Sequence, residues 1–424
     1  MRVMKWSMIA LAVSAGTSQF AMASSQDESK GFVEDSTFSI NTRALYFSRD
    51  FRNNPPGSQS RVEETGLGFN ALYQSGFTQG TIGVGFDAIG LLGLKLDSGK
   101  SRAGTGLFPT GSDGRSQDDY SSAGGAVKFR ISDTVLKAGD QYTTAPVFAS
   151  DDSRLLPEVP EGISLTSNEI KGLKLEAGHF TGIKAQNQTY RDSLHLTEAN
   201  FVGAVYSFTP EFTGSLYYSE VEDYWRKIYS NLNYSHALSD NQSVSLDFNI
   251  YNTKSDGAGL VRAFNDGTTK LDNTIASLQG GYTVDAHTFT LAYQQVTGDG
   301  DYGYGVDGGG TVFVANSVAR SDFNAEGEKS WQARYDLNMA TFGVPGLSFM
   351  ARYITGDDAN TAETSDGKEW ERDIEAKYVV QNGPAKDLSL RLRQATYRSA
   401  DGVYYGSPSI DELRLIVNYP LNIL

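Results

Sequence analysis

The sequence predicts an all-β protein whose strands close into an antiparallel barrel that spans a membrane. Three observations predict it: a secretory leader at the N-terminus, strand-length segments of alternating apolar and polar residues, and aromatic residues at the ends of the apolar faces. The composition agrees, with 45 glycines, 23 tyrosines, 22 phenylalanines and only 11 prolines in 424 residues, which is typical of a large β protein.

Residues 1–23 have the pattern of a signal peptide. Two basic residues lie near the start, Met8 to Ala15 form a short apolar core, and Ala21-Met22-Ala23 supplies a cleavage site of the A-x-A type. The apolar core is too short for a membrane-spanning helix. We therefore expect export of the chain and a mature barrel domain formed by residues 24–424.

Alternation marks the strands along the rest of the chain, because every second side chain of a strand points to the same face. The polar positions carry glycine, serine and asparagine with scattered charges, and several apolar faces end in tyrosine or tryptophan, as in the aromatic girdle of a membrane barrel. The apolar faces, taking every second residue, are Phe38 to Tyr46, Leu67 to Tyr73, Ile82 to Phe86, Val127 to Ile131, Phe212 to Tyr218, Val244 to Ile250, Phe289 to Tyr293, Trp331 to Met339, Leu388 to Leu392 and Leu413 to Tyr419.

The alternation by itself leaves two architectures open. A secreted soluble sandwich also alternates, because one face of each of its sheets meets water. In a membrane every backbone donor must be paired, so a spanning sheet must close without edges. A spanning strand needs ~9–11 residues, so the chain has room for roughly 16–18 strands, and a barrel of that size keeps an aqueous channel.

Composition excludes several other classes of protein. The absence of cysteine excludes disulfides, thiolate zinc sites and thiol catalysis, and the net charge of −15 argues against a nucleic-acid partner. The four histidines are scattered without metal-ligand spacing, and the G-x-G-x-x-G match at residues 303–308 has no helix after it. No enzyme activity, metal or cofactor is expected. The acidic stretch Asp357 to Asp373 is interpreted as a solvated external loop.

The mature chain also resembles the OprD-type outer-membrane porins of pseudomonads, which are carboxylate-selective channels. The segments that carry the resemblance are Gln74 to Asp97, Gly124 to Ser132, Ala145 to Glu158, Leu175 to Thr181, Asp285 to Gln294, Glu328 to Asn338, Gly343 to Tyr353 and Ala376 to Ala395. The resemblance implies an 18-stranded antiparallel transmembrane β-barrel in the Gram-negative outer membrane, with a loop folded inward to constrict the channel. It also implies a monomeric pore, which can associate loosely as trimers, surrounded by outer-membrane lipid.

Basic residues at strand positions that are expected to face the lumen form the main candidate site. Lys377, Arg391, Arg393 and Arg414 fall on the polar face of three strands near the C-terminus, with Arg43 and Arg130 as additions. In the family that the chain resembles, a basic ladder runs along the channel wall, and a row of weak cationic sites lets a carboxylate both enter and leave. The alternative is that each arginine pairs with a lumen acid such as Glu375 or Glu412 and takes no part in transport.

The inward loop is expected at Thr143 to Glu158, and the resemblance implies that its Arg154 contacts the substrate carboxylate, which a planar guanidinium can grip with two nitrogens. The alternative is an ion pair with Asp151, Asp152 or Glu158 that only holds the loop. For the opposite wall the resemblance implies Tyr206, Ser317 and Asp322, with Tyr302 or Tyr304 as a fourth member. Two departures from the family pattern are Arg320 in place of a tyrosine and Gly310 in place of an acid.

Together these features predict selective diffusion of small carboxylate-bearing solutes, such as amino acids or short peptides, into the periplasm. The two departures favour neutral or acidic amino acids and simple organic acids, because they remove an anion and add a cation. A channel for aromatic or other organic acids and a non-selective general porin are alternatives with the same fold. A secreted soluble β enzyme or carbohydrate-binding protein is the alternative from another class.

Overall fold

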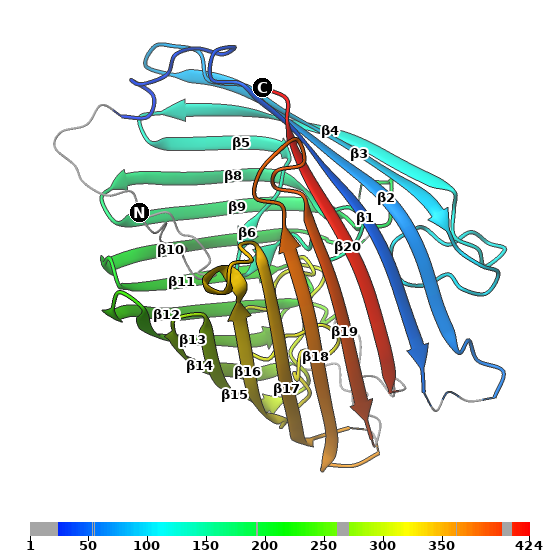
Figure 1. Cartoon of the computed structure of the whole chain (residues 1–424). Helices are drawn as coiled ribbons and strands as arrows, with labels where there is room; N and C mark the ends of the chain where they lie inside the picture. The colour runs from blue at the N-terminus through cyan, green and yellow to red at the C-terminus, as the bar shows by residue number, and fades with distance from the viewer. Residues whose placement is uncertain are drawn as a thin grey trace.

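The structure is a computed structural model that describes residues 24–52, 54, 56–191, 194–260, 271–361, 363–400 and 409–424. The expected signal peptide, residues 1–23, lies outside the described residues. Within them, 18 antiparallel strands form one sheet (Figure 1). Each strand pairs with the next along the chain, and β1 pairs with β20 over Ser39 to Phe51, so the sheet closes into a barrel. The predicted fold class is confirmed.

The strands are mostly 10–15 residues long, long enough to cross a bilayer at a tilt. Their bounds are β1 Thr37–Phe51, β2 Arg61–Gln74, β3 Gly83–Asp97, β4 Asp119–Ile131, β5 Thr134–Asp140, β8 Val159–Ile170, β9 Leu173–Lys184, β10 Ala199–Thr209, β11 Phe212–Val221, β12 Trp225–Ser239, β13 Gln242–Ser255, β14 Asp272–Val284, β15 His287–Asp299, β16 Lys329–Asn338, β17 Leu347–Ala359, β18 Gly367–Val379, β19 Ser389–Ser399 and β20 Ile410–Asn422. Two short strands, β6 (Thr144–Ala145) and β7 (Phe148–Ala149), pair with each other between β5 and β8, and η1 (Met339–Phe342) is a 3-10 turn.

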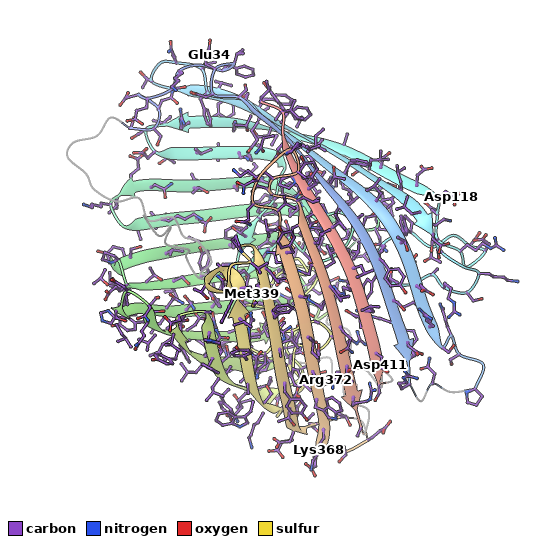
Figure 2. All side chains as sticks on the ribbon, in the orientation of Figure 1. Glu34, Asp118, Met339, Lys368, Arg372 and Asp411 are labelled. Atoms are coloured by element: carbon purple, nitrogen blue, oxygen red, sulfur yellow. The ribbon has the colours of Figure 1, made fainter. Side chains whose placement is uncertain are left out.

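The two rims of the barrel differ in the length of their connections. One rim, here called the short-turn rim, carries two-residue turns such as those at 132–133, 171–172 and 240–241, and the other, the long-loop rim, carries the long connections. In Figure 2, Glu34 and Met339 lie near the short-turn rim, and Asp118, Lys368 and Asp411 lie near the long-loop rim. No helix among the described residues is long and apolar enough to cross a membrane.

The outer face of the barrel is apolar, as the alternation predicts. Leu291, Leu216 and Val202 all expose more than half of their side chains there. Aromatic pairs lie on this face at two levels, with Tyr293 against Trp331 (ring centroids 4.6 Å apart) at one level and Phe289 against Tyr335 (5.3 Å) closer to the short-turn rim. Such paired levels match the two interfacial girdles of an outer-membrane barrel.

The buried core lies inside the barrel, because three long loops fold into the lumen. Residues 98–118, 141–158 and 300–328 contribute most of their apolar side chains to two clusters that also include inward residues of the wall. One cluster packs Val147 and Phe148 against Phe180 and Tyr251, and the other packs Leu155 against Leu45. The expected inward loop at Thr143 to Glu158 is therefore confirmed, and a second and third loop share its position.

The acidic stretch Asp357 to Asp373 is not an external loop, so that expectation is wrong. β17 continues to Ala359 and β18 begins at Gly367, which leaves only a short connection between them. Glu371 and Asp373 point into the barrel and are fully buried. The run of acids misled the prediction because lumen positions of a barrel, unlike the core positions of a soluble sheet, accept charge.

Candidate functional site

Two of the inward loops meet in the lumen. The amide of Gly310 donates to the Ala149 carbonyl (3.1 Å), and the Ala149 amide donates to the Thr311 hydroxyl (3.2 Å). Gly308 has φ +96°, and a Cβ atom there would overlap the carbonyl oxygen of Ala149, so a glycine is required at this contact. The glycine-rich segment of loop 300–328 thus lets the two backbones approach closely.

A buried ion pair fixes loop 300–328 to the wall. Nζ of Lys227, on β12, lies 2.6 Å from the Asp307 carboxylate, and both side chains are completely buried. The indole of Trp225 donates to the same carboxylate (3.1 Å), and the ammonium group also lies over the Trp225 and Tyr302 rings. Tyr302 is 1% exposed and donates its hydroxyl to the Thr311 carbonyl, so it packs behind the loop and does not line the lumen as expected.

The predicted basic wall is formed by adjacent strands in register. Lys377 lies opposite Arg391, and Arg393 lies opposite Arg414 on the next strand. Glu375 lies between them: its carboxylate is 2.8 Å from Arg393 and 3.3 Å from Arg391. The structure therefore brings the four predicted cations together on the inner face and gives two of them a shared acid. Their role in transport stays a prediction.

Arg43 and a further arginine, Arg49, extend this wall onto β1. Arg43 grips the Asp152 carboxylate with two nitrogens (2.8 and 3.0 Å) and donates to the Arg154 carbonyl, so it ties the inward loop to the wall. Arg49 and Arg414 share the buried Glu412, at 2.7 and 2.5 Å. Arg49 was not predicted from the sequence, although it has the same parity as Arg43 on β1. Two more inward arginines that were not predicted, Arg334 and Arg352, each pair with an acid.

Three guanidinium groups surround the buried ring of Phe47. The Cζ atoms of Arg414, Arg49 and Arg154 lie 4.2, 4.7 and 5.4 Å from its centroid. An aromatic face stabilises nearby cations, and it also separates them without neutralising their charge. Glu412 is the only described carboxylate that pairs with any of the three, so this cluster keeps an excess of positive charge.

Arg154 itself forms no ion pair with any described carboxylate. Its Nε donates to the Thr105 carbonyl (3.2 Å) and its Nη1 to the Ser153 hydroxyl (2.7 Å), while the side chain stays partly exposed. Burial, together with the positive charges of Arg414 and Arg49, lowers the pKa of Arg154 to about 10, so it remains protonated at neutral pH.

The three acids proposed as alternative partners of Arg154 are engaged elsewhere. Asp152 pairs with Arg43, Asp151 accepts from the Ser153 amide and hydroxyl, and Glu158 accepts the amides of Asp151 and Gly309 (2.8 and 2.9 Å). Burial raises the pKa of Glu158 to about 7. Arg154 is therefore a cation whose hydrogen-bonding fork still has capacity for an anion from solution.

Part of the expected opposite wall is also present. The Asp322 carboxylate accepts from Ser317 (2.6 Å) and from the Tyr304 hydroxyl, which makes Tyr304 and not Tyr302 the tyrosine of this group. Burial raises the pKa of Asp322, and the negative charge of Asp151 adds to that shift. Arg320, from the same loop, lies close enough to Asp322 to act in the opposite direction.

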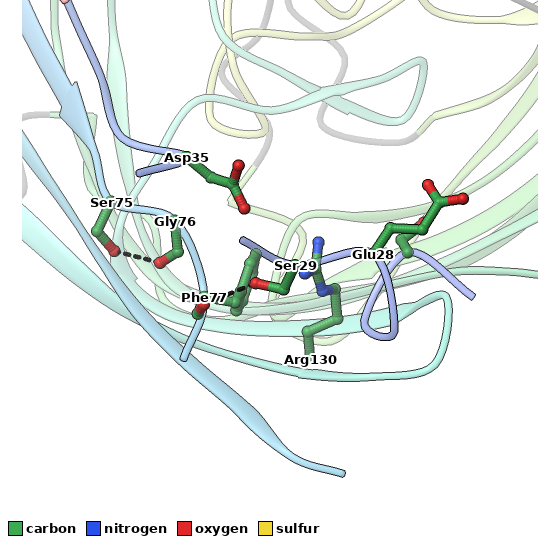
Figure 3. Close-up of a pocket in the computed structure, with 8 residues that line it drawn as sticks. Glu28, Ser29, Asp35, Ser75, Gly76, Phe77 and Arg130 are labelled. Carbon is green, nitrogen blue, oxygen red and sulfur yellow. Dashed lines mark hydrogen bonds between the residues drawn. The ribbon is translucent and has the colours of Figure 1, made fainter. Parts of the chain in front are cut away.

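Two predicted site residues lie elsewhere. Tyr206 is 42% exposed on the outer face of β10, where it packs against Phe208, so its placement in the constriction is wrong. Its parity with Val202 and Phe208 along one strand is the physical reason. Arg130 points inward but lies at the short-turn rim, where it stacks on Phe77 (4.2 Å) and donates to Gln26 of the N-terminal segment. With Phe77 and Ser29 it lines a cavity of about 360 Å³. Figure 3 shows these three side chains together.

The arrangement brings charged side chains of the wall together with the inward loops. Arg43 and Arg414 connect the wall to loops 141–158 and 300–328, the latter through the Ala319 carbonyl (3.3 Å). The same region holds an excess of cations on the wall and several acids on the loops. Among the described residues no group of three or more histidine or acidic side chains could hold a metal ion.

A closed barrel with an apolar outer face and a charged, loop-narrowed interior defines an outer-membrane channel of the porin class. The family model described as "outer membrane porin, OprD family" matches residues 30–423, and the chain belongs to that family. It is 50% identical to Porin D of Pseudomonas aeruginosa, with 100% of both chains covered. The family resemblance inferred from the sequence is thereby confirmed, and the chain is a channel and not an enzyme.

Solved structures agree with this assignment. OccAB1 of Acinetobacter baumannii has a TM-score of 0.90 at 32% identity, covering 95% of this chain and 100% of that chain. OpdK of Pseudomonas aeruginosa, solved with vanillate, has a TM-score of 0.81 at 34% identity, covering 92% of this chain and 100% of that chain. In this class of barrel the short turns face the periplasm and the long loops face the exterior.

Proposed function

We propose that this porin conducts small solutes that carry a carboxylate group, amino acids among them, and that Arg154 of the inward loop 141–158 binds the carboxylate. The observation that carries the proposal is the unpaired state of Arg154 among the described carboxylates, although several acids lie within a few residues of it. A guanidinium held in place by Thr105 and Ser153 is pre-organised for a planar anion.

The surrounding charges support the same solute class. Arg49 and Arg414 share one acid, and with Arg154 they concentrate positive potential around Phe47, because the low-dielectric protein walls focus the field into the lumen. Lys377, Arg391 and Arg393 continue the positive surface along the wall, so a carboxylate meets a series of weak sites. OpdK of Pseudomonas aeruginosa was solved with vanillate, which is itself a carboxylate.

The proposal is tested by ion selectivity in planar bilayers. Reversal potentials are measured in a gradient of sodium propionate, which gives the permeability ratio of propionate to sodium. Arg154→Gln should lower that ratio about tenfold, the effect of losing one charge-assisted hydrogen bond. Arg226→Gln is the matched control, because Arg226 is exposed on the outer parity of β12 at the long-loop rim. If the two variants behave alike, the channel is a general porin and the proposal is wrong.

A further inference from the structure

One arginine on the outer face of the barrel has no acidic partner among the described residues. Arg372 points outward from β18 with an exposed side chain, and Figure 2 shows it near the long-loop rim. Its Nη2 donates to the hydroxyl of Thr396 on β19 (3.2 Å), which holds the guanidinium group against the wall. A guanidinium group has several N–H donors, so most of them stay available to a ligand that approaches from the membrane.

Four other arginines on the outer side of the same rim are paired with acids. Each lies 2.6–2.8 Å from a described carboxylate: Arg52 and Arg398 from Asp411, Arg61 from Glu63, and Arg226 from Asp256. These ion pairs compensate much of the positive charge that a lipid headgroup would meet. Arg372 differs from them because its charge is not compensated by any described carboxylate.

Arg372 lies at the border between the apolar band of the barrel and the rim. Toward the short-turn rim, the next outward residue of β18 is the exposed Ile374. Toward the long-loop rim, the next is Trp370, whose ring stacks on that of Tyr353 on β17 (centroids 5.7 Å apart). Tryptophan and tyrosine on the outer face mark the level of the lipid headgroups. Because the long loops face the exterior, Arg372 lies at the headgroup level of the outer leaflet.

The neighbouring charges favour an anion at this position. Arg398 lies diagonally beside Arg372, two residues beyond its partner in the strand register. Arg398 and Arg52 share Asp411, and Arg52 also contacts Asp50 (3.2 Å). The three arginines of this group therefore outnumber its two acids, and the uncompensated charge is that of Arg372.

We propose that Arg372 binds a phosphate group of lipid A, the glycolipid that anchors lipopolysaccharide in the outer leaflet of the Gram-negative outer membrane. A guanidinium fork binds phosphate with two parallel hydrogen bonds, and the phosphates of lipid A lie at the headgroup level. The acyl chains of the same molecule lie along the exposed Ile374 and Leu392, which continue the outer face toward the short-turn rim. The site thus combines a cation for the phosphate with an apolar surface for the chains.

Binding is measured by native mass spectrometry of the purified porin in detergent. The porin is titrated with lipid A and with the same lipid A after removal of its phosphates. Arg372→Gln should raise the Kd for phosphorylated lipid A about tenfold, because it removes a charge-assisted hydrogen bond, and should leave the Kd for the dephosphorylated form unchanged. The matched control is Arg226→Gln, which changes an arginine of the same face and rim that pairs with Asp256, and its Kd should equal that of the wild type.

Three results would overturn the inference. The first is equal binding of the two forms of lipid A by the wild type, a comparison that needs no variant. The second is an equal loss of affinity in Arg372→Gln and Arg226→Gln. The third is displacement of lipid A by inorganic phosphate at the same concentration, which would mean an anion site without recognition of lipid. An unchanged single-channel conductance of Arg372→Gln shows that its barrel is intact, since the side chain lies outside the lumen.

Discussion

Replacement of Asp307 by asparagine measures how firmly the wall holds loop 300–328. In the native protein the Asp307 carboxylate pairs with Lys227 at 2.6 Å, and both side chains are 0% exposed. Asparagine is nearly isosteric and can still accept from Trp225, but it leaves the lysine ammonium buried without a counter-ion. Removing one partner of a buried ion pair costs ~3–5 kcal/mol, because the remaining charge loses both its partner and its water.

That cost applies to the docked loop and is relieved when the loop moves away and water reaches Lys227. The equilibrium between docked and undocked loop should therefore shift by a factor of roughly a hundred to a few thousand. Tyr251 still accepts from the Phe313 amide (3.1 Å), so we expect the movement to be confined to the first part of the loop. In single-channel recordings, the Asp307→Asn variant should show a larger mean conductance and frequent transitions between levels.

Two further variants test whether the ion pair of Lys227 and Asp307 anchors the loop. Adding Lys227→Met to Asp307→Asn removes the uncompensated charge and should abolish the transitions between conductance levels. The reason is that replacing a buried ion pair by apolar residues often leaves the stability unchanged. Lys254→Met, on the neighbouring strand, breaks an exposed pair with Asp272 (3.4 Å) that is worth ~0–1 kcal/mol, and should leave the recordings unchanged. Recordings of Asp307→Asn that match those of Lys254→Met would refute the anchoring role of this ion pair.

Four further predictions concern the wall and the loop. Burial raises the pKa of Glu158 from 4.5 to about 7, so this side chain gains a proton and loses its negative charge below pH 7. The preference of the channel for anions, measured by reversal potentials, should therefore rise between pH 8 and pH 6. Glu158→Gln should show no such change. Between about pH 4.5 and pH 7 the Glu158 side chain is protonated in the folded state and ionised in the unfolded state. Urea titrations should therefore show that the wild type loses stability relative to Glu158→Gln as the pH rises through this range. Leu392→Arg places a cation against lipid and should cost ~2–4 kcal/mol of folding free energy in vesicles. Ser348→Arg places the same cation on the inner face and should cost much less. Equal costs would contradict the assignment of Leu392 to the lipid face and Ser348 to the lumen. Arg49→Gln leaves Glu412 paired with a single arginine and should lower the propionate-to-sodium permeability ratio severalfold, and an unchanged ratio would remove Arg49 from the site.

Much of the fold could be predicted because the barrel is encoded by a local pattern. Alternation within one strand decides which side chains face lipid, so the inner positions of Lys377, Arg391 and Arg414 follow from their own strands. The same reasoning corrects Tyr206, whose parity with Val202 and Phe208 places it outside. The alternation of the strand, and not the family resemblance, predicts the correct face of the sheet for Tyr206.

The contacts that organise the lumen could not be predicted in this way. Lys227 and Asp307 are 80 residues apart, and Arg49 and Glu412 are 363 apart, so no short-range pattern connects them. The choice between an arginine that is neutralised and one that remains available depends on such pairs. Sequence reasoning therefore identified Arg154 but left open whether its neighbouring acids would pair with it.

The pairing of β1 with β20 has a consequence for biogenesis. Arg43 and Arg49 come from the first strand, and Glu412 and Arg414 come from the last, so the part of the positively charged surface around Phe47 forms only after the two ends of the chain have met. A polypeptide interrupted before its final strand would have two unpaired sheet edges and would also lack Glu412 and Arg414 of the Phe47 cluster. Closure of the barrel and assembly of the Phe47 cluster are thus a single event, and a chain that stops before β20 has neither.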